Sequence, residues 1–242
     1  MIYVIGDVHG EITKLKLLVD FIVGKDVNPE FIFIGDYIDK GEDARTTLAY
    51  LVKLKAKYAC KFLIGNHEYC WKDAGSHIDY LLQYGGKNTM HSFGCTDVME
   101  TQKILLDEYG DFFNELIDYH ITGEYFISHS GLPPEYYTEN NLEHIPQRSF
   151  LFNRYPFITN QAFFQHKFKV IFGHTGFFTP YVDQYKIGID TAACFLEAQP
   201  LTAFCVDTES FINSNLEQIK LAESAQNYCP NILRNKPWRI YD

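Results

Sequence analysis

The sequence predicts an α/β fold, in which short strands alternate with helices. Two apolar runs rich in β-branched and aromatic residues, at positions 1–5 and 31–34, each end abruptly at a glycine, as buried strands do where a loop begins. Residues 11–23 between them carry apolar side chains at helical spacing, which predicts a βαβ arrangement. The chain has 242 residues, 46% hydrophobic and 21% charged, which suits a soluble globular protein with one large core. We therefore expect residues 1–242 to form a single domain.

The predicted strands share one feature, which is the loop that follows each of them. The five apolar runs occupy residues 1–5, 31–34, 61–64, 124–127 and 169–172. The loops after them, in the same order, are GDVHG at 6–10, GDYIDKG at 35–41, GNHE at 65–68, SHSG at 128–131 and GHTG at 173–176. A helix is expected to begin at Glu42 or Asp43, with lysines in its last turns as the helix dipole favours. Later strand-like stretches occupy residues 185–190 and 201–206.

A helical insertion is predicted for residues 71–120. Phe112, Phe113, Leu116 and Ile117 lie at positions that fall on one face of a helix. We expect this segment to form a cap beside the functional site and to influence the choice of substrate.

Charge and composition exclude several classes of protein. Asp and Glu (31) outnumber Lys and Arg (21), a net charge of −10, and no basic cluster is present, so we expect no nucleic-acid partner. No uncharged apolar run reaches the roughly 18 residues of a membrane span, and no signal peptide precedes the first strand, so we expect a cytoplasmic protein. The cysteines contain no C-x-x-C pair and predict neither a zinc thiolate site nor a disulfide framework. They are Cys60, Cys70, Cys95, Cys194, Cys205 and Cys229.

The polar residues of the five loops predict a metal site. In an open α/β sheet, ligands bind at the carboxyl ends of the strands, and these ends carry three aspartates, one asparagine and four histidines. Carboxylate, amide and imidazole ligands without thiolate suit Mn²⁺, Fe²⁺ or Zn²⁺. There are too many ligands for one ion. We therefore expect two ions about 3.5–4 Å apart that clamp a phosphoryl group.

As an ordered set, the five motifs resemble those of the phosphoprotein phosphatase (PPP) branch of the calcineurin-like dinuclear metallophosphoesterases. They span residues 6–176, about 70% of the chain. The resemblance implies an α/β (or α+β) fold, a β-sandwich of two mixed sheets flanked by helices. It also implies a hydrolase with two divalent metal ions, Mn²⁺ first and Fe or Zn as alternatives. The implied reaction is hydrolysis of phosphoserine or phosphothreonine by direct attack of a hydroxide that bridges the two ions.

The resemblance also assigns roles to single residues. The matched metal ligands are Asp7, His9, Asp36, Asn66, His129 and His174. Asp36 matches the ligand that bridges the two ions. His67 matches the general acid, a role that suits a histidine with a pKa near neutrality, and Asp39 matches the carboxylate that orients it. Lys40 and Arg154 match residues that bind the phosphate.

Two positions depart from the family pattern. Lys40 stands where most members carry arginine, and a lysine cannot make the planar bidentate contact of a guanidinium. Ala192, in the segment IDTA at 189–192, stands where glycine is usual, so a reshaped loop is expected there. Glu68, next to His67, is compatible with a supporting role in the site and equally with a surface or helix-capping role. The histidines outside the motifs are expected to be solvated or structural; they are His77, His91, His120, His144 and His166.

Other functions stay open at this point. Enzymes of the same family that cleave dinucleoside tetraphosphates resemble the chain nearly as well, so a bis(5'-nucleosyl)-tetraphosphatase (diadenosine tetraphosphate hydrolase) is the alternative function. Asp39 favours the protein phosphatase, because the bacterial tetraphosphatases lack that carboxylate. A pseudophosphatase that binds phosphoproteins without turnover is a third hypothesis. The expected partner is a phosphoprotein or a phosphorylated small molecule, with no membrane involved.

Overall fold

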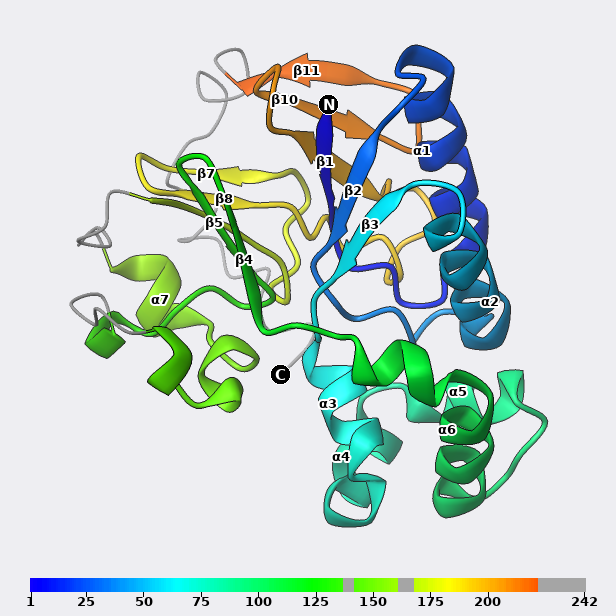
Figure 1. Cartoon of the computed structure of the whole chain (residues 1–242). Helices are drawn as coiled ribbons and strands as arrows, with labels where there is room; N and C mark the ends of the chain where they lie inside the picture. Colours follow the sequence, from blue (N-terminus) through cyan, green and yellow to red (C-terminus); the bar gives the residue numbers. More distant parts are fainter. Residues whose placement is uncertain (137–141, 161–167, 222–242) are drawn as a thin grey trace.

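Two mixed β-sheets packed against each other form the centre of the computed structural model, which describes residues 1–136, 142–160 and 168–221 (Figure 1). The first sheet has the order β11 (Gln218–Lys220), β10 (Ser210–Asn213), β9 (Thr202–Cys205), β1 (Ile2–Ile5), β2 (Glu30–Phe33), β3 (Ala59–Phe62). The second has the order β4 (Tyr119–Thr122), β5 (Tyr125–Ser128), β6 (Lys169–Phe172), β8 (Lys186–Gly188), β7 (Tyr181–Val182). Strands β1, β2 and β3 are parallel, as are β5, β6 and β8. Their carboxyl ends therefore deliver loops to a common edge of each sheet.

Helices cover the outer faces of both sheets. The α-helices are α1 (Ile12–Lys25), α2 (Ala44–Lys55), α3 (Asn66–Lys72), α4 (Ile78–Gln83), α5 (Gly86–Ser92), α6 (Val98–Asn114) and α7 (Tyr155–Thr159). Short 3-10 helices are η1 (Ala74–His77), η2 (Pro134–Tyr136), η3 (Leu142–His144) and η4 (Gln147–Phe150). Asp43 caps α2, as expected, because its side chain accepts a hydrogen bond from the Thr46 amide at 2.9 Å.

Alternation along the strands separates the core into layers. In β1, Tyr3 and Ile5 pack with α1 and α2, whereas Val4 points to the opposite face and packs between the two sheets. In β5, Ile127 faces that same inner layer, and Phe126 faces the outer layer that contains α7. The result is a helix, sheet, sheet, helix sandwich, which confirms the predicted fold of two mixed sheets flanked by helices.

The predicted helical segment ends earlier than expected. The helix α6 stops at Asn114, and residues 119–122 form the edge strand β4 instead of continuing the helix to position 120. The reason is a tertiary contact, since β4 pairs antiparallel with β5 and the Tyr119 ring stacks on Phe126 with centroids 5.3 Å apart. His120 consequently lies in a strand and not in a helix or loop. Strands β7, β10 and β11 were likewise not predicted.

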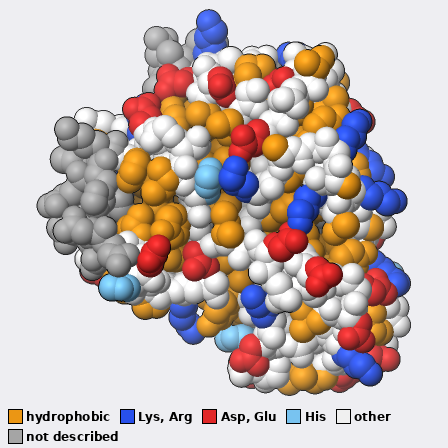
Figure 2. All heavy atoms as spheres, in the orientation of Figure 1, with side chains coloured by type: hydrophobic (Ala, Val, Ile, Leu, Met, Phe, Trp, Pro, Cys, Tyr) orange, Lys and Arg blue, Asp and Glu red, His pale blue; other side chains and the backbone are white. Residues whose placement is uncertain are grey.

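Among the described residues, no helix is long and apolar enough to cross a bilayer. The described cysteines are all free thiols, and Cys229 lies outside the described residues, as does His166. On the face drawn in Figure 2, blue and red side chains alternate over the described surface without a continuous basic stripe.

Candidate active site

The five loops bring the eight predicted polar residues together where the carboxyl edges of the two sheets meet. The loops after β1, β2 and β3 come from the first sheet, and those after β5 and β6 from the second. Every one of the eight side chains is buried, with at most 8% of its surface exposed. They are Asp7, His9, Asp36, Asp39, Asn66, His67, His129 and His174.

Asp36 lies at the centre of the cluster. Its Oδ2 atom is 3.3 Å from His9 Nε2 and 3.9 Å from His67 Nε2, and its Oδ1 atom is 3.5 Å from His129 Nε2. Burial alone would raise the pKa of Asp36, but the three surrounding imidazoles hold it well below the usual value. A carboxylate whose two oxygens lie near different histidine nitrogens is suited to bridge two metal ions, each bound by some of those nitrogens.

The ring nitrogens of the histidines are oriented for metal binding. Nδ1 of His9 donates to the Ile38 carbonyl at 2.8 Å and Nδ1 of His129 to the Ile34 carbonyl at 2.9 Å, which leaves Nε2 of each as the acceptor. Burial, with the nearby Lys40 charge, lowers the pKa of His9 to about 4. A neutral imidazole at pH 7 keeps its lone pair available for a cation.

Two groups of side chains have donor atoms within 4.8 Å of one another, and Asp36 belongs to both. The first contains His9, Asp36 and His67, and the second contains Asp36, His129 and His174. Asn66 adds an amide oxygen, 2.8 Å from His129 Nε2. The mixture of oxygen and nitrogen donors fits divalent ions such as Mn²⁺, Fe²⁺ or Zn²⁺.

Asp7 belongs to neither group, but one of its carboxylate oxygens is buried without a partner. Its Oδ2 atom accepts a hydrogen bond from the His174 amide at 2.9 Å, whereas its Oδ1 atom is buried without any hydrogen-bond partner. Burial, together with the charges of Asp190 and Asp36, raises the pKa of Asp7 well above its usual value. A buried carboxylate oxygen without a partner is costly, and a metal ion at this place would remove the cost.

His67 and Asp39 form a short pair. Nδ1 of His67 is 2.6 Å from Asp39 Oδ2, and Asp39 Oδ1 accepts hydrogen bonds from Trp71 Nε1 at 2.8 Å and Thr89 Oγ1 at 2.5 Å. Trp71 lies in α3 and Thr89 in α5, so the helical segment holds the carboxylate that orients His67. The sequence contained no signal for these two anchors.

Glu68 supports the backbone of the site and is not a surface residue. It is fully buried, and its carboxylate accepts hydrogen bonds from the amides of Asp36 and Tyr37, both at 2.8 Å, and of Gly65 at 3.1 Å. Gly65 has to be a glycine, because a Cβ there would lie 2.1 Å from Asp36 Oδ1.

The backbone of the site is strained. Non-glycine residues with positive φ are uncommon and cost on the order of 1–3 kcal/mol each, and they concentrate at functional sites. In these loops they are His9 (φ 45°), Asp36 (54°), Asp39 (68°), Lys40 (63°), His174 (65°) and Ala192 (58°).

Ala192 has a left-handed backbone conformation, which glycine adopts more easily than alanine. This difference leads to a stability prediction. We expect Ala192→Gly to raise the free energy of unfolding by roughly 0.5–1 kcal/mol in urea denaturation, because relief of the left-handed backbone exceeds the entropic cost of glycine. Ala193→Gly is the matched control, since Ala193 is buried next to it without a positive φ, and it should lower stability. Equal losses of unfolding free energy in both variants would contradict backbone strain at Ala192.

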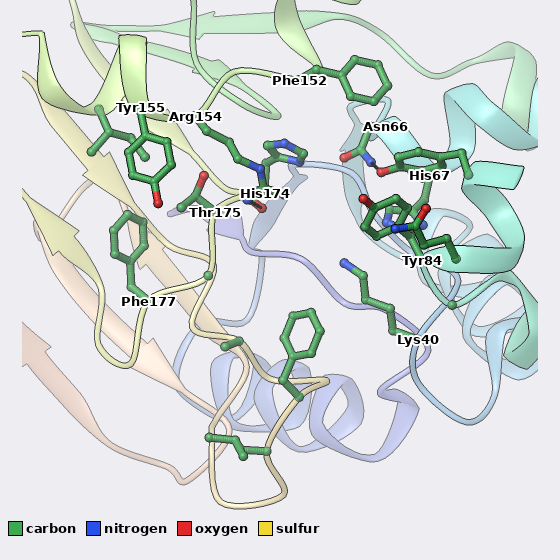
Figure 3. A pocket seen from close by; sticks show the side chains of 18 of the residues that line it. Lys40, Asn66, His67, Tyr84, Phe152, Arg154, Tyr155, His174, Thr175 and Phe177 are labelled. Atoms are coloured by element: carbon green, nitrogen blue, oxygen red, sulfur yellow. Dashed lines mark hydrogen bonds between the residues drawn. The ribbon is translucent and has the colours of Figure 1, made fainter. Parts of the chain in front are cut away.

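A cavity of about 540 Å³ opens beside the cluster (Figure 3). Lys40 and Arg154 line it and reach toward its middle from opposite sides. Nζ of Lys40 lies 2.8 Å from His9 Nε2, and Nη1 of Arg154 donates to the His174 carbonyl at 3.3 Å. Both predicted phosphate-binding residues are therefore next to the candidate metal ligands.

One acidic residue of the site was missed. Asp190 follows β8, the strand parallel to β6, and only 5% of its surface is exposed. Burial raises the pKa of Asp190, although the hydrogen bond from the Ala192 amide and the charge of Lys40 both act to lower it. The signal was present, since residues 185–190 are a strand-like run that ends in aspartate, as at the other loops.

The other described histidines take no part in this arrangement. They lie in η1, α5, β4 and η3, outside both metal-ligand groups and outside the lining of the cavity, and they are His77, His91, His120 and His144.

A family model described as calcineurin-like phosphoesterase matches residues 1–205. The chain belongs to the calcineurin-like phosphoesterase family. It is accordingly a hydrolase of phosphoesters that depends on divalent metal ions and acts on a phosphorylated substrate. The family assignment confirms the expectation drawn from the five motifs.

Solved structures show the same fold at low sequence identity. A cold-active protein-tyrosine phosphatase of a psychrophilic Shewanella species has a TM-score of 0.65 at 13% identity, over 91% of this chain and 80% of that one. A protein provisionally named a diadenosine tetraphosphatase has a TM-score of 0.57 at 16% identity, over 88% and 91%. A serine/threonine phosphatase from Saccharomyces cerevisiae with similarity to human PP5 has a TM-score of 0.54 at 15% identity, over 84% and 71%. At these identities the likeness concerns the fold alone.

Proposed function

We propose that the chain is a PPP-type protein phosphatase that hydrolyses phosphoserine and phosphothreonine monoesters. The observation that carries the proposal is the pair of His67 and Asp39, 2.6 Å apart, beside the candidate metal ligands. The alkoxide of serine or threonine is a poor leaving group and needs a positioned acid. An orienting carboxylate behind the histidine supplies that position.

Six residues would hold two divalent metal ions, for which we propose Mn²⁺. Asp7, His9 and Asp36 would bind one ion, and Asp36, Asn66, His129 and His174 would bind the other. When bound, such ions polarise the phosphoryl oxygens and lower the pKa of coordinated water. Asp36 is suited to the shared position because its two oxygens face different histidines, His9 and His129.

The remaining roles follow from position. His67 would protonate the leaving oxygen through Nε2, since its Nδ1 is taken by Asp39. Lys40 and Arg154 would bind the non-bridging phosphoryl oxygens from the two sides of the cavity, where positive charge stabilises the transition state. We also propose one domain with a cap formed by the helical segment, because Tyr80, Gln83 and Tyr84 of that segment line the cavity.

Hydrolysis of a dinucleoside tetraphosphate is the second candidate. Seven of the residues that line the cavity are aromatic, and such walls suit a nucleobase. Four linked phosphates would require more positive charge than Lys40 and Arg154 supply, the two cationic side chains among the described residues of the lining. We therefore prefer the phosphomonoester. A binding protein without turnover is disfavoured, because the eight polar residues expected of the active enzyme are all present and buried at the site.

A substrate panel tests the proposed function. With Mn²⁺ added, phosphoserine and phosphothreonine peptides should be hydrolysed with kcat/KM at least tenfold above that for diadenosine tetraphosphate, and EDTA should abolish the activity. The reverse order of substrates would support the tetraphosphatase. Absence of hydrolysis on the whole panel would contradict both.

A further inference from the structure

The side-chain amide of Asn66 has different neighbours at its two ends. Asn66 is the first residue of α3, and only 1% of its surface is exposed. Its Oδ1 atom lies 2.8 Å from Nε2 of His129, and its Nδ2 atom donates a hydrogen bond to the hydroxyl of Tyr80 at 2.6 Å. Among the described residues, this hydroxyl is the one hydrogen-bond partner of Nδ2.

The oxygen end of the amide faces a second acceptor. Nδ1 of His129 donates to the Ile34 carbonyl, so Nε2 carries a lone pair on the side of Asn66 Oδ1. Two lone pairs 2.8 Å apart repel each other, but both can bind the same cation. Rotation of the amide by half a turn would replace the repulsion with a hydrogen bond from Nδ2 to Nε2. Both donor atoms would then be lost to the cation.

The Tyr80 hydroxyl opposes this rotation once a cation is bound. When Oδ1 of Asn66 binds a cation, the amide loses electron density and its N–H becomes a stronger donor. The hydrogen bond to Tyr80 is then stronger than in the rotated amide, and a buried N–H left without a partner would be costly. The hydroxyl therefore favours the orientation in which Oδ1 and His129 Nε2 face the same ion.

The ring of Tyr80 is held in place independently of its hydroxyl. Its centroid lies 4.6 Å from that of Tyr84, 6.2 Å from that of Phe152 and 5.9 Å from that of His67. Figure 3 shows Asn66 and Tyr84 beside His67 on the same side of the cavity. Because phenylalanine keeps these ring contacts, Tyr80→Phe removes the hydrogen bond and leaves the packing.

We propose that Tyr80 is a positioning residue for the metal ligand Asn66, whose Oδ1 atom its hydroxyl keeps directed toward the ion that Asn66 and His129 would share. The inference rests on the proposed function, in that it takes these two residues as ligands of one ion. Among the described residues, Asn66 is the one candidate ligand that hydrogen-bonds to Tyr80, so the effect should be confined to that ion. The helical segment thereby contributes to the metal site itself as well as to the wall of the cavity.

Titration with Mn²⁺ after removal of metal by EDTA tests the proposal, with free Mn²⁺ measured by its electron paramagnetic resonance signal. In Tyr80→Phe we expect one of the two ions to bind roughly 10–100-fold more weakly and the other to stay within about twofold of wild type. At saturating Mn²⁺, kcat on a phosphoserine peptide should return to within about threefold of wild type, because all the ligands remain. Tyr84→Phe, which removes the hydroxyl of the neighbouring ring, is the matched control and should leave both Mn²⁺ affinities within about twofold of wild type.

Two variants with a single remaining site identify the ion. In His9→Ala the ion of Asn66 and His129 remains, and adding Tyr80→Phe should weaken its binding by the same factor. In His129→Ala the other ion remains, and adding Tyr80→Phe should leave its affinity unchanged.

The outcomes separate this inference from the proposed function. Unchanged Mn²⁺ affinities in Tyr80→Phe, an equal loss for both ions, or the same loss in Tyr84→Phe would each overturn the inference. A loss of kcat that saturating Mn²⁺ does not restore would also overturn it, because the hydroxyl would then act in the reaction. A wild type that binds two ions and hydrolyses no phosphopeptide would instead overturn the proposed function, and the Mn²⁺ affinities would still decide the role of Tyr80.

Discussion

Asp36→Asn should lower the metal content from about two ions per chain to less than one, and kcat by roughly 10³-fold. Asp36 is the residue shared by both groups of candidate ligands, and the amide replaces one of its two carboxylate oxygens with a group that does not bind metal. Elemental analysis after reconstitution with Mn²⁺ measures the metal, and a phosphoserine peptide measures the activity.

His9→Ala is the comparison variant for Asp36, because His9 belongs to one of the two groups. It should lose mainly one ion. A wild type that is fully active with a single ion at saturation would contradict the dinuclear arrangement, as would an Asp36→Asn protein that keeps both ions.

His67→Asn should lower kcat by roughly 10²–10⁴-fold while leaving the metal content nearly unchanged. The metal content decides between two roles for the His67 side chain, a metal ligand or a general acid. Nε2 of His67 lies within 4.8 Å of donor atoms of His9 and Asp36, which would suit a ligand, whereas its pairing with Asp39 suits an acid. Loss of one metal ion in His67→Asn would show that it is a ligand.

The leaving group supplies a second readout for His67. An aryl phosphate such as p-nitrophenyl phosphate needs little protonation, so its hydrolysis should suffer less than that of a phosphoserine peptide. Asp39→Asn should produce a milder defect of the same kind. His91→Asn, at an exposed position of α5, is the matched control and should leave both substrates unaffected. Equal losses on both substrates would argue that His67 does not act as an acid.

The parts of the fold and site that sequence could predict are those with a local signal. The apolar runs stop at glycine or serine, followed by Asp, Asn or His, so the loops after β1, β2, β3, β5 and β6 were predictable. The eight polar residues lie together as expected. The edge strand β4 could not be predicted, because its alternation of apolar and polar residues is short and its stability comes from pairing with β5.

The supporting residues of the site could not be predicted for a similar reason. Trp71 and Thr89 contact Asp39 from helices that follow it by 32 and 50 positions, and only the packing of those helices brings them there. Glu68 contacts amides 31 and 32 positions away, on a different loop. Asp190 was visible as an aspartate after a strand, but it matched no metal-ligand position and was not considered.

The left-handed residues of the loops affect how the protein fails when it is heated or denatured. The strain at His9, Asp36, Asp39 and His174 sums to several kcal/mol, comparable with the net stability of a typical domain, and the sheets on either side must hold it in place. We expect a small loosening of the sheets to let these loops relax before the strands separate. Inactivation should therefore precede global unfolding, and the temperature at which the enzyme stops working should depend on its loops more than on its core.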